Sequence, residues 1–453
     1  MEILIALLPV LMFAALIIGM FSGLPVAIVL AGVTFLFGAI AMALGEMNLI
    51  QAAILPNRVF GGSIQNQVLI AAPMFIFMGV LLEKSRLAED LLVTTQKLLR
   101  HVPGGLALAV TVLGTILAAA TGIIGASVVM LTVLALPTMI DRGYSPELAG
   151  GTIVSAGTLG ILIPPSVMLI FMGDILTINL AKLFVAALVP GLLLAVIYMI
   201  YIVSRSALDP SIAPRAPALS VEEKKGLWME ALISFGSPLF LIIVVLGSIL
   251  GGYATPTEAA GVGALGALLL GWFRGRITYS VLGDAMDGSI RTIAMLFFIF
   301  VAATGFAYVF RAVGGEHLIV GTALSLNMGD WGILAVLMLM IFALGFFFDW
   351  IEITLIMLPI VSPIVGLMDL GDHVQRSDLI YWFAVLMAVN LQTSFLTPPF
   401  GFALFYLKGA GGDLISMKQI YRGVVPFVLL QLLILSLIIW QPWLVLWLPN
   451  SIY

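Results

Sequence analysis

Apolar segments long enough to cross a bilayer follow one another along almost the whole chain, and they constrain its fold more than any other feature. A helix needs about 20 consecutive apolar residues to span the hydrocarbon core. Runs of about this kind occupy residues 3–21, 24–44, 68–82, 183–204, 232–251, 259–273, 292–310 and 424–440. Only 42 of the 453 residues are charged (19 Lys and Arg, 23 Asp and Glu), against roughly a quarter in soluble domains. We therefore expect an all-α polytopic membrane protein.

The same composition excludes several classes of function. A net charge of -4 without long basic runs argues against nucleic acid as a partner. The chain has no cysteine and only three scattered histidines, so thiolate and histidine metal centres are not expected. GxxxxGK[ST], HExxH and GxSxG are all missing from the sequence. We expect a transporter driven by an ion gradient, neither an enzyme nor an ATP-hydrolysing pump, and with no organic cofactor.

The positions of the basic residues predict the topology. Lys and Arg concentrate at 84–100, at 142, at 205–225 and at 274–276, and such loops favour the cytoplasmic side. Residues 100 and 142 share that side only if 105–140 enters and returns as a re-entrant hairpin. The same count makes 331–368 a hairpin that enters from the opposite face. Both chain termini are then periplasmic.

Two parts of the chain share a pattern of prolines that predicts an internal repeat. The intervals from Ser127 through the following prolines are 10, 27 and 26 residues, and those from Asp349 are 10, 39 and 28. In both parts a lysine precedes the last of these prolines by eight residues. Because the topology turns one part over relative to the other, we expect an inverted-topology repeat.

The repeat and the polar stretches suggest boundaries for the parts of the chain. We predict N-terminal scaffold helices at 1–66 and a first repeat at 67–203, with its hairpin at 105–140 and a broken helix at 149–173. A cytoplasmic linker at 204–230 and further scaffold helices at 231–279 follow. The second repeat is predicted at 280–441, with its hairpin at 331–368 and a broken helix at 379–407. Residues 442–453 are expected to form a periplasmic C-terminal tail.

A Pro-Pro pair interrupts each of the two predicted broken helices, Pro164-Pro165 and Pro398-Pro399. Proline removes a backbone donor and clashes with the preceding turn, so each segment should split into two half-helices. Unwound carbonyls and hydroxyls suit a hard cation such as Na⁺, and half-helix N-termini suit an anion. The alternative is that these residues only kink ordinary membrane helices. The nearby polar residues are Ser155, Thr158 and Ser166, and Asn390, Gln392, Thr393, Ser394 and Thr397.

Three charged residues near apolar segments have two interpretations each. Asp349, with Glu352 close by, is either a cation ligand at the tip of the second hairpin or an acid exposed at its mouth. Arg311 either meets a substrate carboxylate or extends from a helix end toward the membrane surface. Glu258 follows Pro256 at the start of a helix, which favours a capping role over a catalytic one.

Four motifs resemble one family over essentially the whole chain: GTLGILIPPS, GGYATPTEAAGVGALGALLLG, FFFDWIEITLIMLPI and NLQTSFLTPPFGFALFYLKG. The resemblance is to the large membrane subunit of tripartite ATP-independent periplasmic (TRAP) transporters, and the last motif is most similar to the mannitol, chloroaromatic and 2-oxo acid branch. It implies an elevator-type secondary transporter of the bacterial inner membrane with a scaffold and a transport domain. It also implies Na⁺ coupling, a separate small four-helix membrane subunit and a soluble periplasmic substrate-binding protein.

The resemblance also implies roles for individual residues. Gly122, Gly125 and Ser127 match the first hairpin tip, where this chain has one serine in place of a serine-rich cluster. Arg311 matches a basic position used by sialic acid members. We predict a sodium site from Gly122, Gly125, Ser127, Ser155, Thr158, Asp349, Gln392, Thr393 and Ser394. Substrate contacts are predicted for Pro164, Ser166, Arg311, Thr397 and Pro398.

Together these features favour sodium-coupled import of a small organic acid, possessing a carboxylate and delivered by a periplasmic binding protein. A self-sufficient divalent-anion/sodium symporter has the same physical basis. A channel or membrane scaffold without coupled transport is the third alternative, and two helix breaks at matching positions argue against it.

Overall fold

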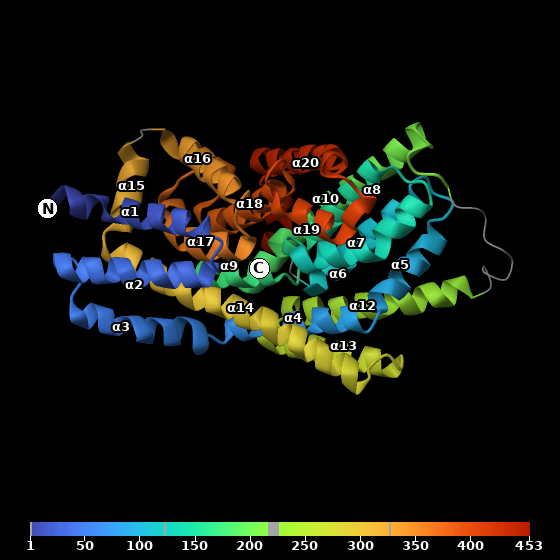
Figure 1. Cartoon of the computed structure of the whole chain (residues 1–453), viewed down its shortest axis with the longest axis horizontal. Helices are drawn as coiled ribbons and strands as arrows, with labels where there is room; N and C mark the ends of the chain where they lie inside the picture. Colours follow the sequence, from blue (N-terminus) through green and yellow to red (C-terminus); the bar gives the residue numbers. More distant parts are fainter. Residues whose placement is uncertain (1, 122–123, 216–225, 326–327) are drawn as a thin grey trace.

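In the computed structural model, which describes residues 2–121, 124–215, 226–325 and 328–453, every regular element is helical (Figure 1). The helices before residue 216 are α1 (Glu2–Met20), α2 (Val26–Leu44), α3 (Leu49–Val59), α4 (Ala71–Lys84), α5 (Leu87–Leu98), α6 (Gly105–Thr121), α7 (Ile124–Asp141), α8 (Pro146–Thr158), α9 (Val167–Ile175) and α10 (Leu180–Leu208). Those after residue 225 are α12 (Leu227–Leu250), α13 (Pro256–Phe273), α14 (Tyr279–Ala312), α15 (Gly315–Ser325), α16 (Gly329–Leu344), α17 (Trp350–Leu367), α18 (Arg376–Leu396), α19 (Phe402–Gly411), α20 (Met417–Trp440) and α21 (Trp443–Ile452).

The lengths and hydropathy of these helices confirm the all-α polytopic prediction. Among the described residues, eight helices are long and apolar enough to cross a membrane: α2, α7, α10, α12, α14, α17, α18 and α20. A further span is formed if Leu49–Ile64 and Val68–Lys84 count as one, although the two segments meet at an angle of 52°. The sequence predicted the second of these segments and missed the helix α3 before it.

Both predicted hairpins are present as pairs of consecutive helices. α6 and α7 form the first, and they contact each other and the neighbouring helix α8. α16 and α17 form the second, and both contact α18. Gly122, predicted at the first tip, lies outside the described residues. Each hairpin is therefore packed on the broken helix of its own half.

The first halves of the two broken helices, α8 and α18, are deeply buried. Every residue of α8 from Leu148 to Thr158 is buried, and α18 is the most deeply buried of the eight candidate spans. α8 also packs closely on α20, where glycine makes the backbones approach. A Cβ atom at Gly423 would overlap the carbonyl oxygen of Glu147, and one at Gly151 would overlap the carbonyl oxygen of Gly423. The contact between α8 and α20 thus has no room for a side chain at Gly151 or Gly423.

A second group of helices extends along the opposite side of the molecule (Figure 1). The 34-residue helix α14 contacts both α2 and α4, and α4 in turn packs on α13. α12 is the least buried of the eight spans, as expected for a helix that faces lipid. Thr255 and Glu258 form a capping box at the start of α13, which confirms the capping role expected for Glu258.

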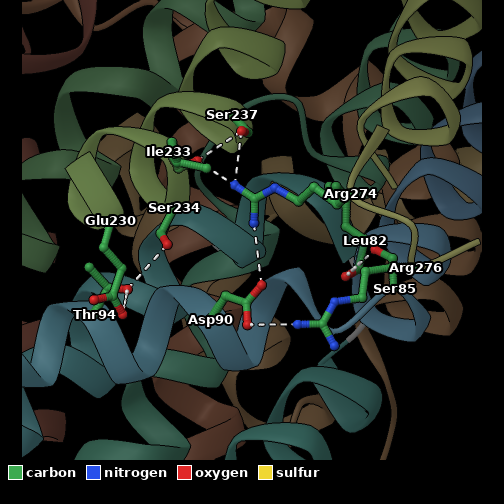
Figure 2. A network of polar contacts seen from close by, with 10 residues as sticks. All are labelled: Leu82, Ser85, Asp90, Thr94, Glu230, Ile233, Ser234, Ser237, Arg274 and Arg276. Atoms are coloured by element: carbon green, nitrogen blue, oxygen red, sulfur yellow. Dashed lines mark hydrogen bonds and ion pairs between the residues drawn. The ribbon is translucent and has the colours of Figure 1, made fainter. Parts of the chain in front are cut away.

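The basic loop after residue 84 contains a helix, α5, that charged residues tie to α12 and α13. Asp90 on α5 pairs with Arg274 at 3.3 Å and with Arg276 at 3.5 Å, both just beyond the end of α13 (Figure 2). Lys97, in the last turn of α5, pairs with Glu230 of α12 at 2.7 Å. The other side of α5 packs against α6 of the first hairpin. We call these five residues the α5 ion cluster.

Two boundaries differ from those expected. α10 continues to Leu208, beyond the predicted start of the linker. The final residues form the helix α21 where the sequence suggested a tail, because its polar and apolar side chains both find partners. Asn450 donates a hydrogen bond to Asp378 at 2.7 Å, and Asp378 also pairs with Lys182 at 2.9 Å.

Candidate functional site

The first break follows Thr158, the last residue of α8. A short 3-10 turn, Leu159–Ile161, leads to the Pro164-Pro165 pair, whose peptide bond is cis, and α9 begins after Ser166. The Ser166 hydroxyl donates to the carbonyl of Ile161 at 2.7 Å. Ser155, Thr158 and Ser166 are all fully buried. The predicted break is therefore observed, with its polar residues inside the protein.

The second break has the same order of features. α18 ends at Leu396, the Pro398-Pro399 bond is also cis, and α19 begins at Phe402. Gln392, Thr393 and Ser394 are fully buried in the last turns of α18, whereas Thr397 and Pro398 are partly exposed. Buried hydroxyls and amides thus precede the break in both halves.

The two breaks meet through one hydrogen bond between the halves. The Gln392 amide donates from Nε2 to the Thr158 hydroxyl at 3.3 Å. The other polar atom of the Gln392 amide, Oε1, is buried without a hydrogen-bond partner. The same is true of the Ser155 hydroxyl, which lies one helical turn before Thr158. A buried polar atom without a partner is costly in a native protein and calls for an explanation. These two atoms therefore have unused capacity to contact a ligand or water.

The electrostatics at this contact favour a cation. The Gln392–Thr158 bond joins the C-terminal turns of two half-helices, and such turns have unpaired carbonyls that carry partial negative charge. Several hydroxyls donate their hydrogen back to their own segment, which leaves oxygen lone pairs directed elsewhere. The observed bonds run from Thr158 to Ser155 O (3.0 Å), Thr393 to Val389 O (2.8 Å), Ser394 to Leu391 O (2.8 Å) and Thr397 to Thr393 O (2.8 Å). Oxygen ligands of this kind suit a hard cation.

Close glycine contacts hold the hairpins against the breaks. A Cβ at Gly157 would come within 2.6 Å of Val128, the residue after the buried Ser127 of the first hairpin. A Cβ at Gly125 would come within 2.9 Å of the Tyr406 ring on α19, which belongs to the other half. A Cβ at Gly345, where the second hairpin turns, would overlap the Ser394 hydroxyl. Each hairpin end thus borders a polar residue or helix of the site.

Asp349 has a structural role that the sequence interpretation overlooked. Its carboxylate accepts from Trp350 N at 2.6 Å, and Glu352 accepts from Asp349 N at 3.0 Å, which together cap α17. Both acids are partly exposed. The pattern Asp-x-x-Glu before an apolar helix is a known signal for this capping arrangement. Asp349 therefore holds the start of α17 at the second hairpin turn.

Arg311 lies apart from the other predicted site residues. Its Nε donates to the carbonyl of Ala307 at 3.3 Å, and the side chain lines a cavity of about 340 Å³ together with Gln51, Arg58, Thr304, Tyr308 and Ala312. No residue of either break lines this cavity. The structure brings together Thr158 of α8 and Gln392 of α18 and leaves Arg311 near the end of α14, in a cavity shared with α3.

The structure adds two residues that the sequence interpretation missed. Thr152 is fully buried, and its hydroxyl has no hydrogen-bond partner. It precedes Ser155 and Thr158 at a spacing of three residues, which places all three near one face of α8 and was a usable signal. Tyr406 meets the first hairpin tip from the other half, and nothing in the sequence around it indicates that contact.

Comparison with known proteins agrees with this architecture. Residues 10–444 match the family model described as tripartite ATP-independent periplasmic transporter, DctM component. The chain belongs to this family. It is 31% identical over 394 residues to the C4-dicarboxylate TRAP transporter large permease protein DctM of Pseudomonas aeruginosa, covering 85% of this chain and 87% of that one.

The permease is also similar to a TRAP relative with a longer chain and to a solved transporter structure. The permease is 30% identical to the isethionate TRAP transporter permease protein DctMQ of Oleidesulfovibrio alaskensis, covering 84% of this chain and 58% of that protein. Its fold is similar to the crystal structure of the Alcanivorax borkumensis YdaH transporter, with a TM-score of 0.63 and 14% identity, over 94% of this chain and 97% of that one. As a TRAP large permease, the protein is a membrane transporter subunit and not an enzyme.

Proposed function

We propose that this permease imports a small organic acid across the bacterial inner membrane by sodium-coupled secondary transport. The contact between Gln392 and Thr158 carries the proposal, because it joins two half-helix C-termini beside buried oxygens without partners. A sodium ion supplies the positive charge that this arrangement favours. The organic acid class rests on the relatives, which are named for C4-dicarboxylates and isethionate.

The remaining predicted residues have consistent places in this proposal. The N-termini of α9 and α19 follow the two breaks, and helix N-termini favour the negative charge of a carboxylate. Pro164, Ser166, Thr397 and Pro398 precede these N-termini and are proposed to border the substrate. Gly125, Ser127, Ser155, Thr158, Gln392, Thr393 and Ser394 are proposed to surround the cation.

We propose an elevator movement in which the two hairpins and broken helices shift relative to the helices around α14. A separate small four-helix membrane subunit and a periplasmic binding protein complete the transporter. The longer relative named DctMQ supports the first of these partners, since this permease matches only 58% of its length. Both termini are proposed to lie in the periplasm, with the basic loops and the α5 ion cluster on the cytoplasmic side.

Reconstitution tests the proposal directly. Proteoliposomes that contain the permease, its small subunit and its binding protein are expected to accumulate labelled succinate only with an inward Na⁺ gradient. Uptake that is unchanged when both the gradient and the binding protein are omitted would refute the proposal. Uptake that needs Na⁺ and no binding protein would favour a self-sufficient symporter. Flux that is indifferent to every ion gradient would favour a channel.

Substitutions at Asp349 separate its capping role from a role in the cation site. Asp349→Asn and Asp349→Ser retain a capping oxygen and remove the charge, whereas Asp349→Ala removes both. If the charge acts on the cation, all three variants are expected to need about tenfold more Na⁺ for half-maximal uptake, since a hydrogen bond or contact to a charged group contributes about 1.5–3 kcal/mol. Only Asp349→Ala should also lose about 1 kcal/mol of stability.

The measurements are Na⁺-dependent uptake in proteoliposomes and thermal unfolding in detergent. A wild-type Na⁺ requirement in Asp349→Asn would remove Asp349 from the cation site and leave it as the cap of α17.

A further inference from the structure

The cavity that contains Arg311 has an unusual excess of hydrogen-bond donors. Two guanidinium groups, Arg58 and Arg311, line it, and no carboxylate does. Among the residues that the structure describes, neither arginine forms an ion pair. Each guanidinium has five N–H donors in a planar fork that matches phosphate and carboxylate oxygens. The cavity is therefore suited to an oxyanion.

Neighbouring contacts hold this cavity in shape. The Tyr308 hydroxyl of α14 donates to the Gln51 carbonyl of α3 at 2.9 Å, which fixes the two helices against each other. The Gln51 side-chain oxygen accepts from Asn48 N at 2.8 Å in the capping box of α3. This bond uses the Gln51 side-chain oxygen, so the remaining polar group of the side chain is its NH₂ donor. Both arginines occupy the last turn of their helices, where the dipole stabilises their charge without an anion.

The helix beside the arginines has the character of a lipid-facing surface. No residue of α3 is buried, and Leu49 and Ile50 are 79% and 74% exposed, whereas Ala52 and Leu55 are partly buried. Ile54 and the adjoining Phe60 are exposed as well. In a membrane protein, exposed apolar side chains beside a basic pair match the acyl chains that adjoin a lipid phosphate. A free carboxylate would make no use of these side chains.

We propose that Arg58 and Arg311 bind the phosphate of an anionic phospholipid whose acyl chains lie along α3. The phosphate oxygens accept from both guanidinium groups and from Gln51. The site is separate from the breaks that carry substrate and sodium, so it holds whether or not the proposed function is correct.

Lipid binding to the intact, delipidated permease tests this site. Native mass spectrometry in detergent is expected to show phosphatidylglycerol binding at least about fivefold more tightly than phosphatidylcholine, since one basic residue near an anionic lipid surface contributes about that factor. The double variant Arg58→Gln/Arg311→Gln should lose this preference. Arg291→Gln is the matched control, because Arg291 is an exposed arginine of α14 that does not line the cavity. It should retain the preference.

Other outcomes would overturn the proposal. A double variant that keeps the lipid preference excludes the two arginines as its source. Wild-type protein that binds succinate or inorganic phosphate at this site, with no preference among lipids, would indicate a free-anion site. A double variant that loses only its contact with the binding protein would indicate a protein-docking surface. If the double variant does not fold, the wild-type preference must still weaken as ionic strength rises, and a salt-independent preference would overturn the proposal.

Discussion

Replacing Gln392 by methionine is expected to reduce substrate uptake at least about tenfold while the protein remains folded. Methionine keeps the length of the side chain but has no amide, so the hydrogen bond to Thr158 is lost. The Thr158 hydroxyl still donates to the Ser155 carbonyl, but its buried oxygen loses its donor. Such a loss costs about 1–3 kcal/mol, and 1.4 kcal/mol corresponds to about tenfold in an equilibrium constant. The substitution also removes the Gln392 oxygen that has no protein partner.

The measurement is succinate uptake into proteoliposomes, accompanied by thermal unfolding in detergent. Gln431→Met is the matched control, because Gln431 is an equally buried glutamine on α20 and is not part of either break. It should transport at nearly the wild-type rate. Equal uptake by Gln392→Met and wild type would show that the contact between the breaks does not serve transport.

Replacing Gly423 by alanine is expected to destabilise the permease more than any other single-methyl change discussed. The new Cβ would overlap the carbonyl oxygen of Glu147 at the start of α8, and this atom belongs to the backbone and cannot rotate away. Overpacking a tight interior typically costs about 1–3 kcal/mol, and two helices would have to separate to relieve it. A Cβ at Gly151 of α8 would come similarly close to the Gly423 carbonyl oxygen. The backbones therefore leave no space next to Gly423 into which the added methyl group could move.

Thermal unfolding and the yield of monodisperse protein in detergent measure this effect. Gly409→Ala serves as the control, because Gly409 is an exposed residue of α19 and a Cβ there would meet nothing within 4 Å. Alanine is the better helix former by about 1 kcal/mol, so this variant should be at least as stable as wild type. A Gly423→Ala protein that unfolds at the wild-type temperature would contradict the close packing of α8 on α20.

Features that depend on neighbouring residues were predictable from the sequence. Proline pairs break helices wherever they occur, so the breaks at Pro164 and Pro398 followed from local chemistry. The first hairpin followed from placing Arg100 and Arg142 on the same side of the membrane, and the second followed from the same count of crossings. The helix α5 was missed because its charged residues made the segment resemble a loop, and its partners on α12 and α13 are more than 130 residues away.

Contacts between distant segments limited the prediction of the site. The sequence identified Thr158 and Gln392 as polar residues near a break, but their hydrogen bond spans 234 positions and depends on how the halves pack. For Arg311 the residue itself was predicted but its neighbour was not. Its place at a helix end was foreseen, whereas its neighbour Arg58 comes from a helix that the hydropathy pattern did not distinguish. The capping role of Asp349 was readable from Glu352 three residues later.

The α5 ion cluster has a consequence for the segment that connects α5 to the first hairpin. Asp90 and Lys97 fasten α5 to α12 and to the residues just after α13. α6 begins at Gly105, so residues 99–104 connect α5 to the first hairpin. Gly104 there has a φ of +71°, a conformation that side chains rarely adopt. In the proposed elevator movement, the backbone between α5 and the first hairpin can therefore change direction only within these six residues.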